Sequence, residues 1–281
     1  MRHLQQPDGV TDMLAPAIGQ NPQIVSRPAP RPGQPFGNRP ATIPGVSPEA
    51  MMHSNFLVLG DSHIAYFRQA MQMIGLLPWQ VQFCEASVGT GIGTGTGSAT
   101  NAFETFRRFL RDKNRQSTVI LQLGEAVCSF VIWYRSKLYN ETITDQLRAT
   151  ISAYVAFIHE LRGQGFIDLV ITGATLPTIR DGDQLGAVAQ MRREVTATLA
   201  ERTKLTLDYN KALQTHAREL GLRYFDISAD LMDPATKTIK ADLRNPDPYD
   251  HHLDYQAAGA LWAGKLRDLI IAQTSRRRFL A

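Results

Sequence analysis

The sequence is poor in cysteine and has little excess charge of either sign. Its two cysteines, Cys84 and Cys128, end or follow apolar runs, so we expect two buried reduced thiols and no disulfide framework. Neither cysteine has a second ligand at zinc-site spacing, and we expect no metal and no cofactor. The net charge is only +4, with 30 basic and 26 acidic side chains mixed along the chain. This balance does not indicate a nucleic-acid-binding protein.

Long apolar runs are also missing. The most apolar stretch, Val119 to Tyr134, is too short to span a bilayer and carries Glu125. The N-terminus lacks the continuous apolar segment of a secretory signal, so we expect a cytoplasmic protein without a membrane span. A basic cluster, Arg276 to Arg278, marks residues 274–281 as a C-terminal tail. We expect this tail to be solvated, with contact to a phosphate or a membrane surface as the alternative.

Proline is concentrated at one end of the chain. Ten of the fifteen prolines fall in the first fifty residues, where few large apolar side chains are present to build a core. Because proline fixes φ and removes a backbone donor, we expect residues 1–52 to form a disordered, polyproline-like arm. The arm is expected to be a spacer, and the alternative is a docking segment for a protein partner.

Residues 53–273 have the alternating pattern of an α/β domain. Short apolar runs predict five strands, at 55–59, 81–84, 119–123, 167–171 and 223–227. Helical spacing between them predicts helices at 64–74, 102–110, 142–162, 187–220 (broken near Arg202) and 257–272. Short buried strands separated by helices predict a five-stranded parallel sheet covered on both faces, a three-layer sandwich.

In such a sheet, ligands bind beyond the carboxyl ends of the strands. Ser62 follows the first predicted strand, in Gly60-Asp61-Ser62-His63, and precedes a helix. A serine hydroxyl at this edge, with its backbone N–H near a helix start, suits a nucleophile whose attack creates an oxyanion. The alternative is that Asp61 and Ser62 only cap the helix.

A nucleophilic serine needs a base, usually a histidine oriented by a carboxylate. Two histidines and three aspartates occur together in Asp247-Pro-Tyr-Asp-His-His-Leu-Asp254, just before the last helix. A metal site made by these neighbours alone is not expected, because adjacent side chains of an extended segment point apart.

Together these segments resemble the SGNH/GDSL hydrolase family over roughly residues 55–272. Val58-Leu-Gly-Asp-Ser-His63 resembles its first block, and the Asp–His cluster resembles its last block. Gly124-Glu125-Ala126-Val127-Cys128 resembles a variant third block that often reads Gly-Glu-Ile-Asp-Cys. The resemblance implies a flavodoxin-like fold in which Ser62 attacks an ester carbonyl and a C-terminal histidine is the base.

The resemblance also implies an oxyanion hole made by three donors. These are the Ser62 N–H, a glycine N–H after the second strand and an asparagine side chain after the third. Gly91 is the expected glycine, with Gly89 as the alternate, whereas Ala126 stands where the asparagine should be. Gln122 or Ser129 would have to replace that donor, or turnover would be weak or absent.

The spacing of the last block differs from the family pattern, which places the aspartate three residues before the histidine. His252, followed by Leu253, best matches the family histidine, and Asp250 lies two residues before it. We therefore expect Asp250 and His252 to complete the triad, with His251 and Asp247 as alternates. The expected substrate-binding residues are His63, Glu125 and Trp133.

The resemblance implies hydrolysis of an acyl ester, with an acetylated sugar or polysaccharide as the expected substrate. The alternative is a catalytically weak or inactive module that binds a glycan or protein partner in polysaccharide biosynthesis, for example that of cellulose. Both the missing asparagine and the proline-rich arm favour this alternative.

Overall fold

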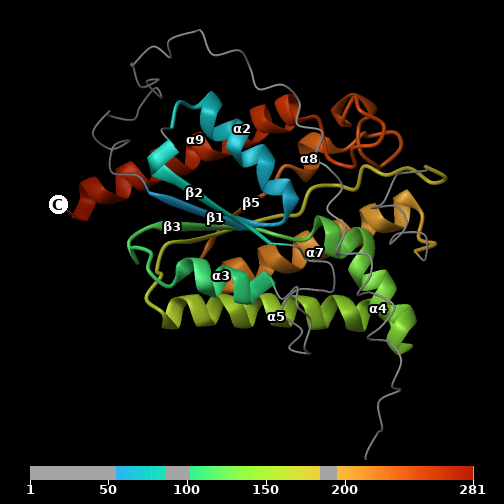
Figure 1. Ribbon diagram of the computed structural model, residues 1–281, viewed down its shortest axis with the longest axis horizontal. Helices are drawn as coiled ribbons and strands as arrows, with labels where there is room; N and C mark the ends of the chain where they lie inside the picture. Colours follow the sequence, from blue (N-terminus) through green and yellow to red (C-terminus); the bar gives the residue numbers. More distant parts are fainter. Residues whose placement is uncertain (1–54, 77, 87–101, 184–194, 281) are drawn as a thin grey trace, which may run out of the picture. The chain divides into compact units, whose positions relative to one another are not determined.

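The computed structural model describes residues 55–76, 78–86, 102–183 and 195–280. The expected N-terminal arm and the glycine-rich loop with Gly89 and Gly91 lie outside these residues, so their predictions stay open. Within the described residues, strands and helices alternate along the chain (Figure 1).

The five strands form one parallel sheet in the order β2-β1-β3-β4-β5. They are β1 (Phe56–Gly60), β2 (Val81–Glu85), β3 (Thr118–Gln122), β4 (Leu169–Thr172) and β5 (Arg223–Phe225). Every residue of β1, β3 and β4 is buried, whereas the edge strand β2 has exposed positions. Continuous apolar strands of this kind are expected when helices cover both faces of a sheet. The predicted three-layer α/β architecture is confirmed.

Helices α2 (Ala65–Met73), α8 (Ser228–Leu231) and α9 (Tyr255–Leu280) cover one face of the sheet (Figure 1). They pack on Phe56, Val58, Ile120 and Val170. Trp262 of α9 lies against Phe67 of α2, with ring centroids 4.6 Å apart. Because strand side chains alternate, the neighbouring positions of the same strands face the other layer.

That other layer consists of α3 (Ala102–Leu110), α5 (Ile143–Gly163) and α7 (Leu199–Glu219). It packs on Leu57, Leu59, Val119 and Leu121. Phe103 of α3 stacks on Phe157 of α5 at a centroid distance of 4.2 Å. The predicted helix at 102–110 is confirmed, and the one at 142–162 is shifted by a single residue.

The helix predicted at 187–220 has different bounds: residues 187–194 lie outside the described residues, residues 195–198 are not helical, and no break occurs at Arg202. Helix α7 begins after a capping box formed by Thr198 and Glu201 and runs without interruption to Glu219. Arg202 lies buried in its first turn, where its guanidinium donates to the carbonyl oxygens of Ile179 at 2.7 Å and Ala197 at 3.2 Å. The Arg202 guanidinium therefore ties the helix start to the preceding segments.

Two segments between β3 and α5 were not expected as separate elements. A π-helix, η3 (Val127–Val131), leads directly into α4 (Ile132–Tyr139). Gly124 makes the turn that precedes them with φ of 136°, and a Cβ there would lie 2.5 Å from Cε1 of Tyr209. Short 3-10 helices, η1 (Ser62–Ile64), η2 (Pro78–Gln80) and η4 (Ala241–Leu243), complete the fold. Helix α9 continues to Leu280, through residues assigned above to a tail.

Both cysteines are buried and unbridged, as predicted. Burial raises the pKa of the Cys128 thiol well above its ordinary value, so this thiol stays protonated. Among the described residues, no helix is both long and apolar enough to cross a membrane.

Candidate active site

Ser62 lies in the turn that follows β1. Gly60 permits this turn, because a Cβ on Gly60 would lie 2.2 Å from Cγ2 of Ile64 and 2.3 Å from the carbonyl oxygen of Gln122. Asp61 caps η1 by accepting a hydrogen bond from the His63 N–H at 3.0 Å. The capping role considered for this turn therefore belongs to Asp61. The half-buried Ser62 hydroxyl has a different partner.

That partner is His252. The Nε2 atom of His252 lies 2.8 Å from the Oγ atom of Ser62, and its Nδ1 atom lies 2.6 Å from the Oδ1 atom of Asp250. The same carboxylate oxygen also accepts the backbone N–H of His252 at 2.9 Å. The structure thus connects Ser62, His252 and Asp250 in one chain of hydrogen bonds, the arrangement in which a histidine can take a proton from serine.

Several contacts hold Asp250 and its loop in place. The Oδ2 atom of Asp250 accepts hydrogen bonds from Nδ2 of Asn245 at 3.0 Å and from the hydroxyl of Tyr255 at 3.3 Å. Burial and the charge of Asp250 raise the pKa of Tyr255 to about 12, so its hydroxyl stays protonated. One residue after His252, the Leu253 N–H donates to the buried Tyr66 hydroxyl of α2 at 2.7 Å. No motif in the sequence points to these supporting residues.

The protonation states suit general base catalysis. Burial lowers the pKa of His252 below its ordinary value, and the neighbouring His63 lowers it further, against the opposing effect of Asp250. Burial alone would raise the pKa of Asp250, but the hydrogen bonds from the His252 backbone and ring lower it overall. At neutral pH the pair is therefore a neutral imidazole beside a carboxylate.

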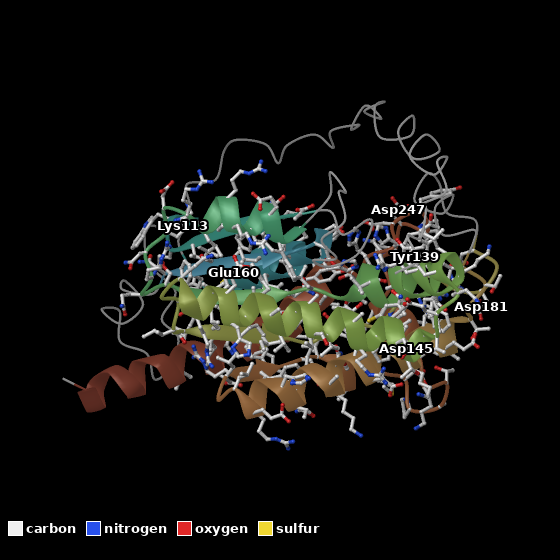
Figure 2. All side chains as sticks on the ribbon, turned by 90° about the horizontal axis from the view of Figure 1, so that it is seen from below. Lys113, Tyr139, Asp145, Glu160, Asp181 and Asp247 are labelled. Atoms are coloured by element: carbon white, nitrogen blue, oxygen red, sulfur yellow. The ribbon has the colours of Figure 1, made fainter. Side chains whose placement is uncertain are left out.

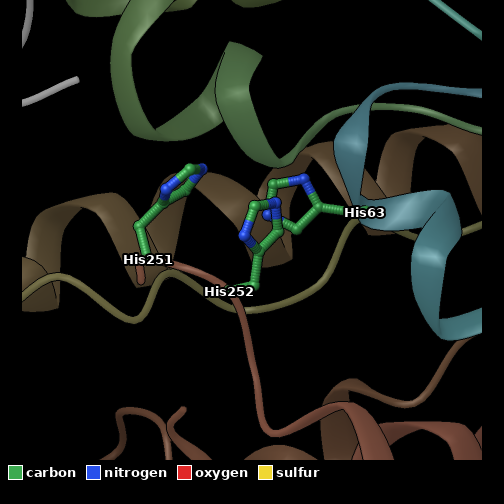
Figure 3. Close-up of side chains that lie close together, drawn as sticks. All are labelled: His63, His251 and His252. Carbon is green, nitrogen blue, oxygen red and sulfur yellow. The ribbon is translucent and has the colours of Figure 1, made fainter. Parts of the chain in front are cut away.

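The two alternates, His251 and Asp247, take no part in this chain of hydrogen bonds. Asp247 is exposed at the periphery (Figure 2), where its side chain accepts the Tyr249 N–H at 3.0 Å. The carbonyl oxygen of His251 accepts a hydrogen bond from Thr178. The His251 ring lies beside that of His252 at a centroid distance of 4.1 Å (Figure 3). The expectation that these adjacent side chains point apart is therefore wrong, because the loop bends at His252.

A second histidine network lies directly behind Ser62. The Nδ1 atom of His63 is 2.9 Å from Oδ1 of Asp61, and its Nε2 atom is 3.3 Å from Oε2 of Glu125. The other oxygen of Glu125 accepts the Ser129 hydroxyl at 2.6 Å. All four side chains are buried. The sequence signal for this network is the Asp-x-His spacing, which is the same for Asp61 and His63 as for Asp250 and His252.

Solved structures resemble this arrangement of sheet and helices. A candidate acylhydrolase from Bacteroides fragilis has a TM-score of 0.51 and 11% identity, over 79% of this chain and 88% of that chain. A GDSL-like lipase from Bacteroides thetaiotaomicron has a TM-score of 0.50 and 10% identity, over 81% and 93%. A Streptococcus pneumoniae protein described as a candidate platelet activating factor has a TM-score of 0.52 and 16% identity, over 77% and 84%. The chain has the SGNH/GDSL hydrolase fold. No protein-family model and no curated protein matches the sequence.

In this SGNH/GDSL fold, the residues after β3 differ from the pattern expected of an oxyanion hole. The Ala126 side chain carries no donor and packs against the core. Ser129, one of the two suggested replacements, already donates its hydroxyl to Glu125. Gln122, the other, is buried at the end of β3, and its Oε1 has no hydrogen-bond partner among the described residues. Gly89 and Gly91 lie outside the described residues, so of the two backbone donors predicted for the oxyanion hole the structure describes only the Ser62 N–H.

The expected substrate-binding residues differ in accessibility. His63 and Glu125 are buried in the network behind Ser62, not exposed at the rim. Trp133 is partly buried, and its indole N–H donates to the Cys128 carbonyl oxygen at 2.8 Å. Its ring packs against the core, so a sugar-stacking role for Trp133 stays a prediction.

Proposed function

We propose that this chain is a serine esterase that hydrolyses an acyl ester, or transfers its acyl group, through Ser62. The observation that carries the proposal is the chain of hydrogen bonds from Ser62 through His252 to Asp250. The SGNH/GDSL fold supports it, since GDSL-like lipases share this architecture.

The reaction follows from the positions of the protons. As the Ser62 oxygen attacks the ester carbonyl, Nε2 of His252 takes the hydroxyl proton, and Asp250 stabilises the resulting imidazolium. The same nitrogen then gives the proton to the leaving alcohol, which leaves an acyl group on Ser62. Water attacks this acyl-enzyme with His252 again acting as base, and the acid is released.

Within acyl esters, we expect a short acyl group on a polar alcohol, such as an acetylated sugar or polysaccharide. The half-buried side chains around the Ser62–His252 pair support this choice because they are polar or aromatic: His251, His252 and Tyr255. Such groups suit hydroxyl-rich alcohols better than long acyl chains.

Covalent labelling tests the nucleophile directly. A fluorophosphonate probe should label the wild-type chain and fail to label Ser62→Ala, while His216→Ala, changed at a half-buried histidine of α7 outside the site, should label like wild type. Esterase assays with p-nitrophenyl acetate and octanoate and with an acetylated sugar then order the substrates. Equal lack of labelling in wild type and Ser62→Ala would remove the enzyme proposal.

That outcome would favour a binding module with an SGNH/GDSL fold that recognises a glycan or a protein partner. Ala126 is the observation behind this second candidate, because loss of one oxyanion donor typically lowers turnover by ~100- to 1,000-fold. In that case the Ser62→Ala variant should bind polysaccharides as tightly as wild type does.

A further inference from the structure

Three imidazoles from two distant segments converge beside Ser62. His63 comes from the turn after β1, whereas His251 and His252 come from the loop before α9 (Figure 3). Each offers a ring nitrogen, and the three nitrogens lie within 4.8 Å of one another. The ring centroid of His63 lies 4.7 Å from the centroid of His252 and 5.9 Å from the centroid of His251. Histidine nitrogens are among the preferred ligands of zinc.

The surroundings of two of these rings match those of metal-binding histidines. Such histidines usually bond one ring nitrogen to a carboxylate, which orients the other nitrogen toward the metal. Asp61 contacts Nδ1 of His63 at 2.9 Å, and Asp250 contacts Nδ1 of His252 at 2.6 Å. The carboxylates therefore fix both rings by the same nitrogen and leave Nε2 as the nitrogen that would bind a metal.

The charge of the cluster also favours a dication. Asp61, Asp250 and Glu125 place three carboxylates around the three imidazoles, and Glu125 lies 3.3 Å from Nε2 of His63. The Oδ2 atom of Asp61 is buried without a hydrogen-bond partner among the described residues. Uncompensated negative charge in a buried site is costly, and a bound cation would offset that cost.

We propose that His63, His251 and His252 form a zinc site, and that zinc bound there stops hydrolysis by occupying Nε2 of His252. Zinc–nitrogen bonds of about 2.05 Å put ligand nitrogens about 3.4 Å apart in a tetrahedral site, so the rings must approach slightly. His251 is half-buried, and the carboxylate contacts that fix His63 and His252 do not involve its ring. The nitrogen that binds zinc can no longer accept the Ser62 proton. This inhibitory half rests on the proposed function, whereas the binding half does not.

Metal binding is measured first, without reference to activity. The full chain, prepared without an added tag, is titrated with CoCl2 while the visible d–d bands of four-coordinate cobalt are followed, and with ZnCl2 by calorimetry. We expect one equivalent to bind. His251→Ala, and His251→Gln as the variant closer in size, should weaken binding at least about 10-fold, the lower end of the loss caused even by changes around a metal ligand. His216→Ala should bind like wild type.

Hydrolysis is then measured at increasing zinc concentration, each variant relative to its own metal-free rate. Zinc should inhibit wild type, a chelator should restore the rate, and the half-inhibiting concentration should rise at least about 10-fold in His251→Ala. Saturable binding that is equal in wild type and His251→Ala would overturn the site. Zinc binding at the site without inhibition would overturn the proposal that zinc stops hydrolysis. A metal-free wild type without esterase activity would instead contradict the proposed function, and the cobalt titration would still decide the site.

Discussion

The molecule uses the same three-residue spacing twice, with different results. Asp61 and His63 stand after β1, and Asp250 and His252 stand before α9. In both pairs one carboxylate oxygen accepts the backbone N–H of the histidine two residues later and also contacts its Nδ1 atom. The aspartate therefore fixes the ring in the same way in both places.

The difference lies at the far nitrogen of each ring. Nε2 of His63 faces the carboxylate of Glu125, whereas Nε2 of His252 faces the hydroxyl of Ser62. A ring whose two nitrogens both face carboxylates has no hydroxyl proton to accept. A ring between a carboxylate and a hydroxyl can accept one. The local motif thus orients a histidine, and its partner from another segment decides whether it can be a base.

The largest expected effect comes from replacing each aspartate by asparagine. In Asp250→Asn, Nδ2 of Asn245 already donates to the Oδ2 position, and Asn245 is itself fixed because its Oδ1 accepts the Asp247 N–H. The Asn245 donor opposes an NH2 group at the Oδ2 position, so we expect the NH2 group to turn toward Nδ1 of His252, which favours the wrong tautomer and also costs the bond from the His252 backbone N–H. We expect kcat/KM for p-nitrophenyl acetate to fall by ~1,000- to 10,000-fold.

Asp61→Asn is the matched control for this prediction. Oδ2 of Asp61 has no partner among the described residues, so the amide NH2 can occupy that position while Oδ1 still accepts both bonds from His63. Asparagine is also a good cap. A loss of less than about 10-fold is expected, in line with a preserved tautomer. Equal losses in the two variants would show that the pairs are not distinguished by these contacts.

The next effect concerns stability and the pair around His63. Glu125→Ala removes the acceptor of the Ser129 hydroxyl and the partner of Nε2 of His63, both of them buried. Breaking a buried pair on one side typically costs about 3–5 kcal/mol, and we expect a decrease of that size in the free energy of unfolding, measured in urea.

Glu160 of α5 offers a surface comparison (Figure 2). It forms a bidentate pair with Arg107 at 2.8 and 2.9 Å, but both side chains are about one-third exposed. Glu160→Ala should therefore cost only about 1 kcal/mol or less. If Glu125→Ala were as mild as Glu160→Ala, the network around His63 would not hold the turn after β1.

The sequence predicted the sheet and its two helical layers because strand and helix periods are local properties of the chain. The five apolar runs and the helix at 102–110 needed no long-range information. Sequence periodicity could not place Arg202 inside an uninterrupted helix, because its buried guanidinium is held by the carbonyl oxygens of Ile179 and Ala197. The π-helix at Val127–Val131 has no periodic signal of its own, since every one of its residues is buried.

For the candidate site, the sequence likewise predicted the residues that lie in short motifs but not the long-range contacts between them. Ser62, Asp250 and His252 lie in short motifs at the expected edge of a parallel sheet, so their order along the chain was informative. The role of Glu125 beside His63 could not be predicted, because it depends on how close the turns after β1 and β3 lie to each other. Nor does any local pattern connect Tyr66 with the Leu253 N–H across 187 residues.

The smallest expected effect links the two histidines through pH. Burial, and then His63, lower the pKa of His252, so the rate of the wild type should be lost on the acid side of about pH 6.5, the ordinary histidine pKa. Protonated His252 cannot take the Ser62 proton, which fixes the direction: kcat/KM falls as pH decreases through this pKa.

The variant His63→Gln tests the effect of the neighbouring ring. It removes one contribution that lowers the pKa of His252, while Asp250, Glu125, Tyr66 and Tyr255 remain. The midpoint of the acid limb should therefore rise, and the variant should lose more of its rate than wild type does as the pH falls. His216→Gln should leave the midpoint unchanged. An unchanged or lower midpoint in His63→Gln would mean that the buried pair only supports the turn and does not act on the base.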